Sequence, residues 1–234
     1  MPILILARHG RTAANADGTL AGRTPGVGLD ERGREQARAA AARLEGLPLS
    51  AAVSSPLERC RQTARLLLAG TGLRATPDSR LTECDYGDWT GEPLKTLARR
   101  KEWRTVQGQP SAARFPGGES LSAMSARAVA AVRDHDTTVA RDHGPEAVWL
   151  AVSHGDIIKA VLADALGLHL DSFQRIVVGP GSLSVVRYTG QRPYVVATNT
   201  VAGSLRDLRP PRRRRRRGED AAVGGGSGTG AGSG

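Results

Sequence analysis

The sequence predicts an α/β protein, a three-layer sandwich with a mostly parallel central sheet. Short apolar runs alternate along the chain with longer alanine-rich or amphipathic segments, and this alternation is typical of strands joined by helices. Two of the apolar runs end in the same dipeptide, His-Gly. With 234 residues the chain can bury one ample core, since about 200 residues is ordinary for a single α/β domain.

The first strand is expected over residues 3–7, a short aliphatic run that leads into His9 and a glycine. Such a run is typical of a parallel strand that is covered on both faces. Residues 31–44 follow Asp30 and are rich in alanine and arginine, so a helix capped by that aspartate is predicted. A second, short strand is expected over residues 51–54.

The next helix is predicted to begin at Pro56, because proline suits the first position of a helix. Ser55 is then the expected N-cap, and the helix is expected to end near Gly70. The remaining predicted elements are a helix over 120–143, an apolar strand from 147 that ends at His154-Gly155, a helix over 155–168, and strands over 182–188 and 193–199.

Charge and composition divide the chain near Leu208. The formal net charge is +10; residues 209–234 hold seven arginines against two acidic residues, a contribution of +5, so residues 1–208 carry the other +5. The proline-broken arginine run and the glycine- and serine-rich end predict a disordered tail over 209–234. That tail can bind polyanions weakly, but no specific nucleic-acid partner is expected. The modest positive excess of the folded part suits a small anionic substrate.

Cysteine content and hydropathy place the protein in the cytoplasm. The chain has two cysteines, Cys60 and Cys84, which make neither a disulfide framework nor a zinc cluster. Two ordinary buried thiols are the favoured interpretation, and a redox response is the alternative. The sequence has neither the apolar core of a signal peptide nor a run of about 20 apolar residues that would span a membrane.

Basic and imidazole side chains gather at the predicted strand ends. Arg8 and His9 end the first strand, and His154 ends a later strand of the same sheet. In such sheets, ligands bind outside the carboxyl ends of the strands. Arg59 falls in the first turn of a predicted helix, where both the helix terminus and the guanidinium favour an anion. Taken alone, His9 is interpreted equally well as a residue that ends the strand and caps a loop. Taken together, Arg8, His9, Arg59 and His154 predict a binding site for phosphate.

Five ordered motifs resemble one known family, the histidine phosphatase superfamily, also called phosphoglycerate mutase-like. The motifs are ARHGRTAAN, SSPLERCRQTA, LTECDYGDWTG, FPGGES and VSHGD. The resemblance extends over nearly all of residues 2–200 and is strongest to an actinobacterial branch of phosphatases and phosphomutases. It implies the phosphoglycerate mutase-like fold, no metal and no cofactor.

The resemblance also implies roles for individual residues. His9 matches the nucleophile that becomes phosphohistidine, and Glu83 matches the general acid, with Asp85 as the nearest substitute. A protonated His154 is expected to share the charge of the phosphate oxygens with the two arginines. The other residues that the resemblance places at the phosphate pocket, its rim or the substrate side are Arg8, Arg59, Arg11, Thr12, Asn15, Tyr86 and Gly155.

The activity expected from the resemblance is hydrolysis of a small phosphorylated metabolite. A phosphomutase is the alternative, and a binding protein without catalysis is a third. The matched catalytic positions are all intact, which disfavours the third. The basic stretch over residues 92–104 does not fall in the register of the mutase clamp, and PGGES is the form common in phosphatases, so phosphatase is preferred. The substrate and the oligomeric state are left open.

Overall fold

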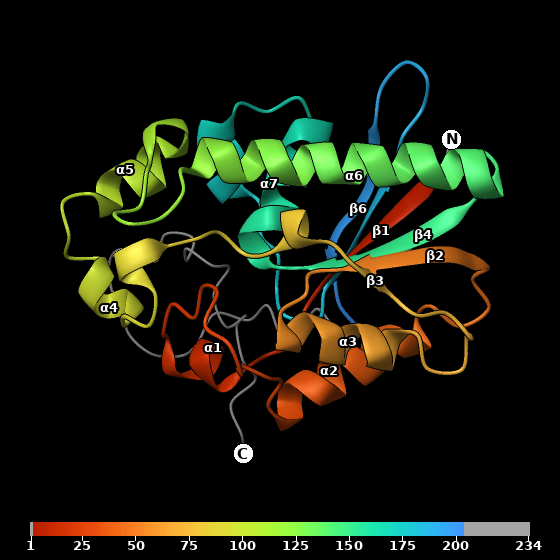
Figure 1. Cartoon of the computed structure of the whole chain (residues 1–234), viewed down its shortest axis with the longest axis horizontal. Helices are drawn as coiled ribbons and strands as arrows, with labels where there is room; N and C mark the ends of the chain where they lie inside the picture. The colour runs from red at the N-terminus through yellow and green to blue at the C-terminus, as the bar shows by residue number, and fades with distance from the viewer. Residues whose placement is uncertain (1, 204–234) are drawn as a thin grey trace.

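A single six-stranded sheet forms the centre of the protein (Figure 1), in a computed structural model that describes residues 2–203. The strand order is β3-β2-β4-β1-β5-β6. Within it, β5 is the strand that pairs antiparallel with its neighbours, whereas the pairs on the other side of β1 are parallel. The strands are β1 (Ile3–Arg8), β2 (Leu49–Ser54), β3 (Thr76–Pro77), β4 (Val148–Ser153), β5 (Leu183–Arg187) and β6 (Tyr194–Thr200). The predicted fold class and mostly parallel sheet are confirmed, while the predicted tail over 209–234 lies outside the described residues.

Helices cover both faces of this sheet. Helices α2 (Glu31–Ala42) and α3 (Glu58–Leu67) lie on one face, and α6 (Leu121–His143) and α7 (Gly155–Ala165) lie on the other (Figure 1). Among residues 2–203, no helix combines the length and apolar character that a bilayer crossing requires. The short helices are α1 (Ala13–Asp17), α4 (Leu94–Leu97) and α5 (Trp103–Gly108), with 3₁₀ turns η1 (Ser79–Leu81), η2 (Gly87–Trp89), η3 (Pro110–Ala112) and η4 (Leu170–Arg175).

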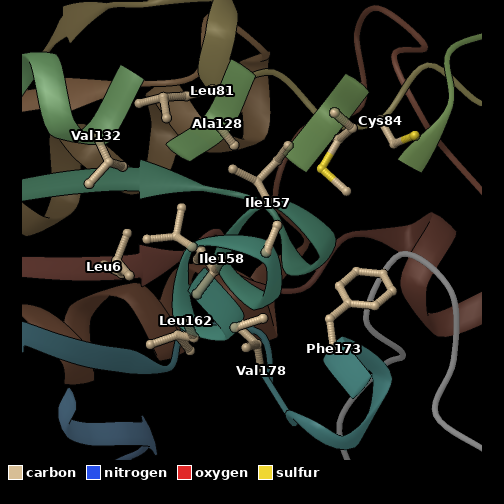
Figure 2. Packing of buried hydrophobic residues seen from close by; sticks show 14 of the residues in the cluster. Leu6, Leu81, Cys84, Ala128, Val132, Ile157, Ile158, Leu162, Phe173 and Val178 are labelled. Atoms are coloured by element: carbon tan, nitrogen blue, oxygen red, sulfur yellow. The ribbon is translucent and has the colours of Figure 1, made fainter. Parts of the chain in front are cut away.

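Strand β1 is buried on both faces, which explains its continuous aliphatic run. Leu4 and Leu6 belong to the larger core cluster, under α6 and α7, whereas Ile5 and Ala7 belong to the cluster under α2 and α3. This split follows the alternation of side chains along a strand. Figure 2 shows Leu6 among aliphatic side chains of α6 and α7. A strand held this firmly fixes the position of the residues at its carboxyl end.

The predicted start of α3 is wrong by two residues. The helix begins at Glu58 with Leu57 as its N-cap, and Leu57 makes no side-chain capping bond. Ser55 serves another purpose: its hydroxyl lies 2.8 Å from Nε2 of His154. Residues 55–57 therefore form the connection that leads from β2 to α3. The cap predicted for α2 is confirmed, because Asp30 accepts from the N–H of Gly33. Ser120, predicted as the first residue of the next long helix, is the N-cap of α6 and accepts from the N–H of Ala123.

A close backbone crossing fixes the loop that leaves β1. A Cβ atom on Gly33 would lie 2.0 Å from the carbonyl oxygen of Arg11, and one on Gly10 would lie 2.2 Å from that of Gly33. Contacts this short between backbone atoms leave no room for any residue larger than glycine. The first turn of α2 thus holds the loop directly behind His9.

Candidate active site

The two His-Gly strand ends meet at the carboxyl edge of the sheet. Arg8 of β1 pairs in register with Ser153 of β4, and the N–H of His9 donates to the carbonyl oxygen of Ser153 over 3.0 Å. As a result, the rings of His9 and His154 lie edge to face, with their centroids 5.3 Å apart. Both side chains are buried. The structure therefore brings together the two imidazoles that the sequence predicts at one edge.

His9 has the tautomer that a nucleophile requires. Its Nδ1 lies 2.7 Å from the carbonyl oxygen of Gly10, and because a carbonyl only accepts, Nδ1 carries the proton. Nε2 of the neutral ring is then left with its lone pair. Burial lowers the pKa of His9 well below its usual value, and the charges of Arg59 and Arg8 lower it further. The ring is therefore neutral and nucleophilic at pH 7.

Two buried guanidinium groups supply positive charge beside these rings. Arg8 donates through Nη1 to the carbonyl oxygen of Val178, and Arg59 donates through Nη2 to that of Gly22, each over 2.7 Å. Burial lowers the pKa of Arg8 to about 10, although Glu83 opposes this effect, so the group is still charged at pH 7. Nη1 of Arg59 is buried and has no hydrogen-bond partner among the described residues. An anion is the partner that such a group calls for.

His154 differs from its predicted charge state. Burial lowers its pKa well below the usual value, with Arg59 and His9 adding to the shift, so the ring is neutral at pH 7 rather than protonated. The contact with the Ser55 hydroxyl and a contact of 3.4 Å from the Cys60 thiol to the same Nε2 fix the orientation of the ring. A phosphoryl group would act in the opposite direction, because negative charge favours the protonated form.

Glu83, the residue predicted as the general acid, is buried within electrostatic reach of a second carboxylate. Its side chain is 3% exposed, and burial, followed by the charge of Asp156, raises its pKa to about 7. Asp85, the alternative, has a side chain that is 41% exposed, 3.5 Å from a guanidinium nitrogen of Arg23. A carboxyl that holds its proton near neutral pH suits acid catalysis. The geometry therefore favours Glu83 over Asp85.

A clamp of three charged residues holds the backbone of Glu83, and the sequence analysis missed it. Arg23 and Arg127 donate to the carbonyl oxygen of Glu83 over 2.9 and 3.2 Å. Glu119 accepts from both guanidinium groups, over 2.9 and 2.6 Å. In the sequence, Glu119 is visible only as the glutamate of the family motif FPGGES. Through this clamp, residues far from the reacting atoms position the acid.

The residues predicted at the pocket rim make local contacts. Arg11 donates to Asp30 over 2.8 Å. Thr12 caps α1 and forms a reciprocal capping box with Asn15. Their contact with a phosphate therefore stays a prediction.

Tyr86 and Gly155 lie on the α7 side of the site. Gly155 is the first residue of α7 and His154 is its N-cap. The positive end of the helix dipole therefore lies next to His154. Tyr86 is buried, packs edge to face on Phe115, and donates its hydroxyl proton to Asp156 over 2.8 Å. The contact of Tyr86 or Gly155 with substrate also stays a prediction.

The two cysteines are buried free thiols. Burial raises the pKa of Cys60 to about 12 and raises that of Cys84 even further above its usual value. Both thiols are therefore protonated and unreactive at pH 7, which agrees with the interpretation as ordinary core residues.

Among the described residues, no group of three or more histidine, cysteine or acidic side chains is arranged to hold a metal ion. Catalysis without metal or cofactor stays a prediction.

Comparisons of the sequence and of the structure with known proteins point to the same family. The family described as "Histidine phosphatase superfamily (branch 1)" matches residues 4–201. A Yersinia pestis protein named "Probable phosphoglycerate mutase GpmB" is 33% identical over 186 residues, which are 78% of this chain and 83% of that protein.

Two solved structures share the fold. YhfR of Bacillus stearothermophilus superposes with a TM-score of 0.78 at 26% identity and covers 86% of this chain and 98% of its own. A mycobacterial glucosyl-3-phosphoglycerate phosphatase, solved with VO3, has a TM-score of 0.76 at 28% identity and covers 85% and 98%. The matched span includes both His-Gly strand ends, Arg59 and Glu83, and by this evidence the chain belongs to the histidine phosphatase superfamily.

Proposed function

We propose that the protein is a phosphomonoester hydrolase that acts through a phosphohistidine at His9. The observation that carries the proposal is the pairing of a neutral His9, protonated at Nδ1, with the unpartnered buried Nη1 of Arg59. The first is the nucleophile for a phosphoryl group, and the second is a donor for its oxygens.

The reaction takes two steps. Nε2 of His9 attacks phosphorus, the ester P–O bond breaks, and the leaving alcohol takes the proton of Glu83. Water then attacks the phosphohistidine while the Glu83 carboxylate accepts a proton, and inorganic phosphate and free His9 result. Such reactions depend on positioning and on charge stabilisation, which Arg8, Arg59 and the N-terminus of α7 supply.

The proposed substrate is a small phosphorylated metabolite, and the proposed location is the cytoplasm. Support for hydrolysis comes from the solved relatives, one of which is named a glucosyl-3-phosphoglycerate phosphatase. A phosphomutase is the second candidate, because curated relatives at 33% identity carry a phosphoglycerate mutase name.

Product analysis separates the two candidates. With 3-phosphoglycerate or a sugar monophosphate, we expect inorganic phosphate to accumulate without a positional isomer. Phosphate is measured colorimetrically and the isomer by ³¹P NMR, with and without a priming bisphosphate. If the isomer forms faster than phosphate is released, the mutase is the correct assignment.

The leaving group tests Glu83. An alkyl alcohol has a pKa of roughly 15 and needs a proton to leave, whereas nitrophenol, with a pKa of about 7, does not. The Glu83→Gln variant should therefore lose at least about tenfold more activity on an alkyl phosphate than on p-nitrophenyl phosphate. The matched control is Asp85→Asn, for which no such difference is expected; a selective loss in this variant instead would move the acid role to Asp85.

The pH profile gives an independent check on the same residue. Glu83 donates only when protonated, and its pKa is raised to about 7, so activity on the alkyl ester should fall as the pH rises through 7. In Glu83→Gln that alkaline fall should disappear. An unchanged alkaline limb in the variant would assign the titration to another group.

A further inference from the structure

A second pocket lies between α3 and the segment that leads into β3. Its volume is about 490 Å³, which is within the usual range for small-molecule sites. On the α3 side it is lined by Arg61, Arg65 and Leu68, which share one stripe of the helix, and on the other side by residues 73–77. Figure 1 shows α3 beneath the β2 end of the sheet. Arg59, in the first turn of the same helix, does not line this pocket and donates instead to the carbonyl oxygen of Gly22.

Three arginines give this pocket an uncompensated positive charge. Arg61, Arg65 and Arg74 line it, and no acidic residue does. In the part of the chain that the structure describes, none of the three guanidinium groups takes part in a hydrogen bond or an ion pair. Some other surface arginines are paired with carboxylates, for example Arg80 with two aspartates and Arg133 with one. Three neighbouring guanidinium groups without a carboxylate repel one another, and an anionic ligand would relieve that repulsion.

The wall of the pocket is apolar. Ala64 and Leu68 of α3 are buried, and Leu73 and Ala75 pack against the same core cluster. An inorganic ion would use the arginines but not this surface. An organic body that covers the wall would gain free energy from burial of apolar area.

We propose that this pocket binds a small organic anion that carries at least two phosphate or carboxylate charges and an apolar body. The charged groups would bind Arg61, Arg65 and Arg74, and the body would lie on Leu68 and Leu73. This site is separate from the predicted phosphate pocket, because Arg59, two residues before Arg61, does not line it and donates instead to the carbonyl oxygen of Gly22.

One residue that lines this second pocket also contacts a histidine of the candidate active site. Ser55 lines the pocket, and its hydroxyl lies 2.8 Å from Nε2 of His154. A ligand in the pocket would therefore contact a residue that orients a catalytic histidine.

The test uses naphthalene-1,5-disulfonate, a flat organic dianion that the enzyme cannot hydrolyse. Its binding to the full chain is measured by titration calorimetry in about 0.15 M salt, where long-range attraction is screened. In Arg65→Glu/Arg74→Glu we expect an affinity at least about tenfold weaker, because two charge-assisted contacts become repulsive. The control, Arg175→Glu/Arg192→Glu, makes the same change in net charge at two exposed arginines outside the pocket, and it should bind as the wild type does.

A second variant tests the apolar wall. Leu73→Ser keeps all three arginines and should weaken the disulfonate while leaving binding of sulfate alone unchanged. The proposal is overturned if the wild type does not bind the disulfonate, if both double variants bind equally, or if Leu73→Ser has no effect. Since the probe is not a substrate, these results do not depend on the proposed hydrolase activity.

Discussion

Replacement of His9 with alanine is expected to abolish phosphate release, with a loss of about 10⁴-fold or more, as for other nucleophiles that form covalent intermediates. The expectation follows from the ring's tautomer and from its buried position at the end of β1. The adjacent His154 is not available to replace it, because its Nε2 is already in contact with Ser55 and Cys60.

The intermediate provides a direct readout for this variant. Wild-type protein given a ³²P-labelled substrate and quenched in alkali should retain label that acid removes, which is the signature of a phosphorus–nitrogen bond. His9→Ala should retain none, and the control His143→Ala, at an exposed position, should retain as much as the wild type. Undiminished turnover in His9→Ala would refute the proposed function as a whole.

Loss of Arg59 is expected to lower kcat/KM by at least about 10²-fold. The two terminal nitrogens of its guanidinium group differ in their contacts. Nη2 donates to the carbonyl oxygen of Gly22, whereas the buried Nη1 has no partner among the described residues and is proposed to donate to the phosphoryl oxygens. Arg59→Lys should fail almost as badly as Arg59→Ala, because one ammonium group cannot reproduce that fork.

The control for this arginine is Arg38→Ala on α2, where the side chain is 59% exposed and full activity is expected. Steady-state kinetics on p-nitrophenyl phosphate, together with matched melting curves, separate lost catalysis from lost folding. If Arg59→Lys retained full kcat/KM, a point charge would be sufficient, and the proposed division of roles between Nη1 and Nη2 would be wrong.

Local patterns were enough to predict five of the six strands, and the two of them that lead into a histidine, but not the two-residue β3. Residues 3–7, which precede Arg8 and His9, are apolar at every position because β1 is covered on both faces, and that pattern is visible in the chain itself. The start of α3 was predicted less well, since proline and serine signal a helix start only while the serine is free to cap. Here Ser55 is committed to His154, a residue 99 positions away.

The environment of Glu83 could not be predicted from the sequence either. Its raised pKa depends on burial and on Asp156, and its backbone is held by Arg23 and Arg127. Each of these partners comes from a different part of the chain, so no local motif reveals the charge state of the carboxyl. Only the assembled fold places them around one residue.

The central position of β1 in the sheet has a consequence for folding during synthesis on the ribosome. This strand is made first, yet its parallel partner β4 begins at Val148, and the backbone of Arg8 is completed only by Ser182. At about 5–20 residues per second, synthesis of the intervening chain takes roughly 10 to 30 s. Throughout that interval the aliphatic strand lacks β4 and β5, its two neighbours in the sheet. His9 and His154 can therefore meet only late in synthesis, after β4 has paired with β1.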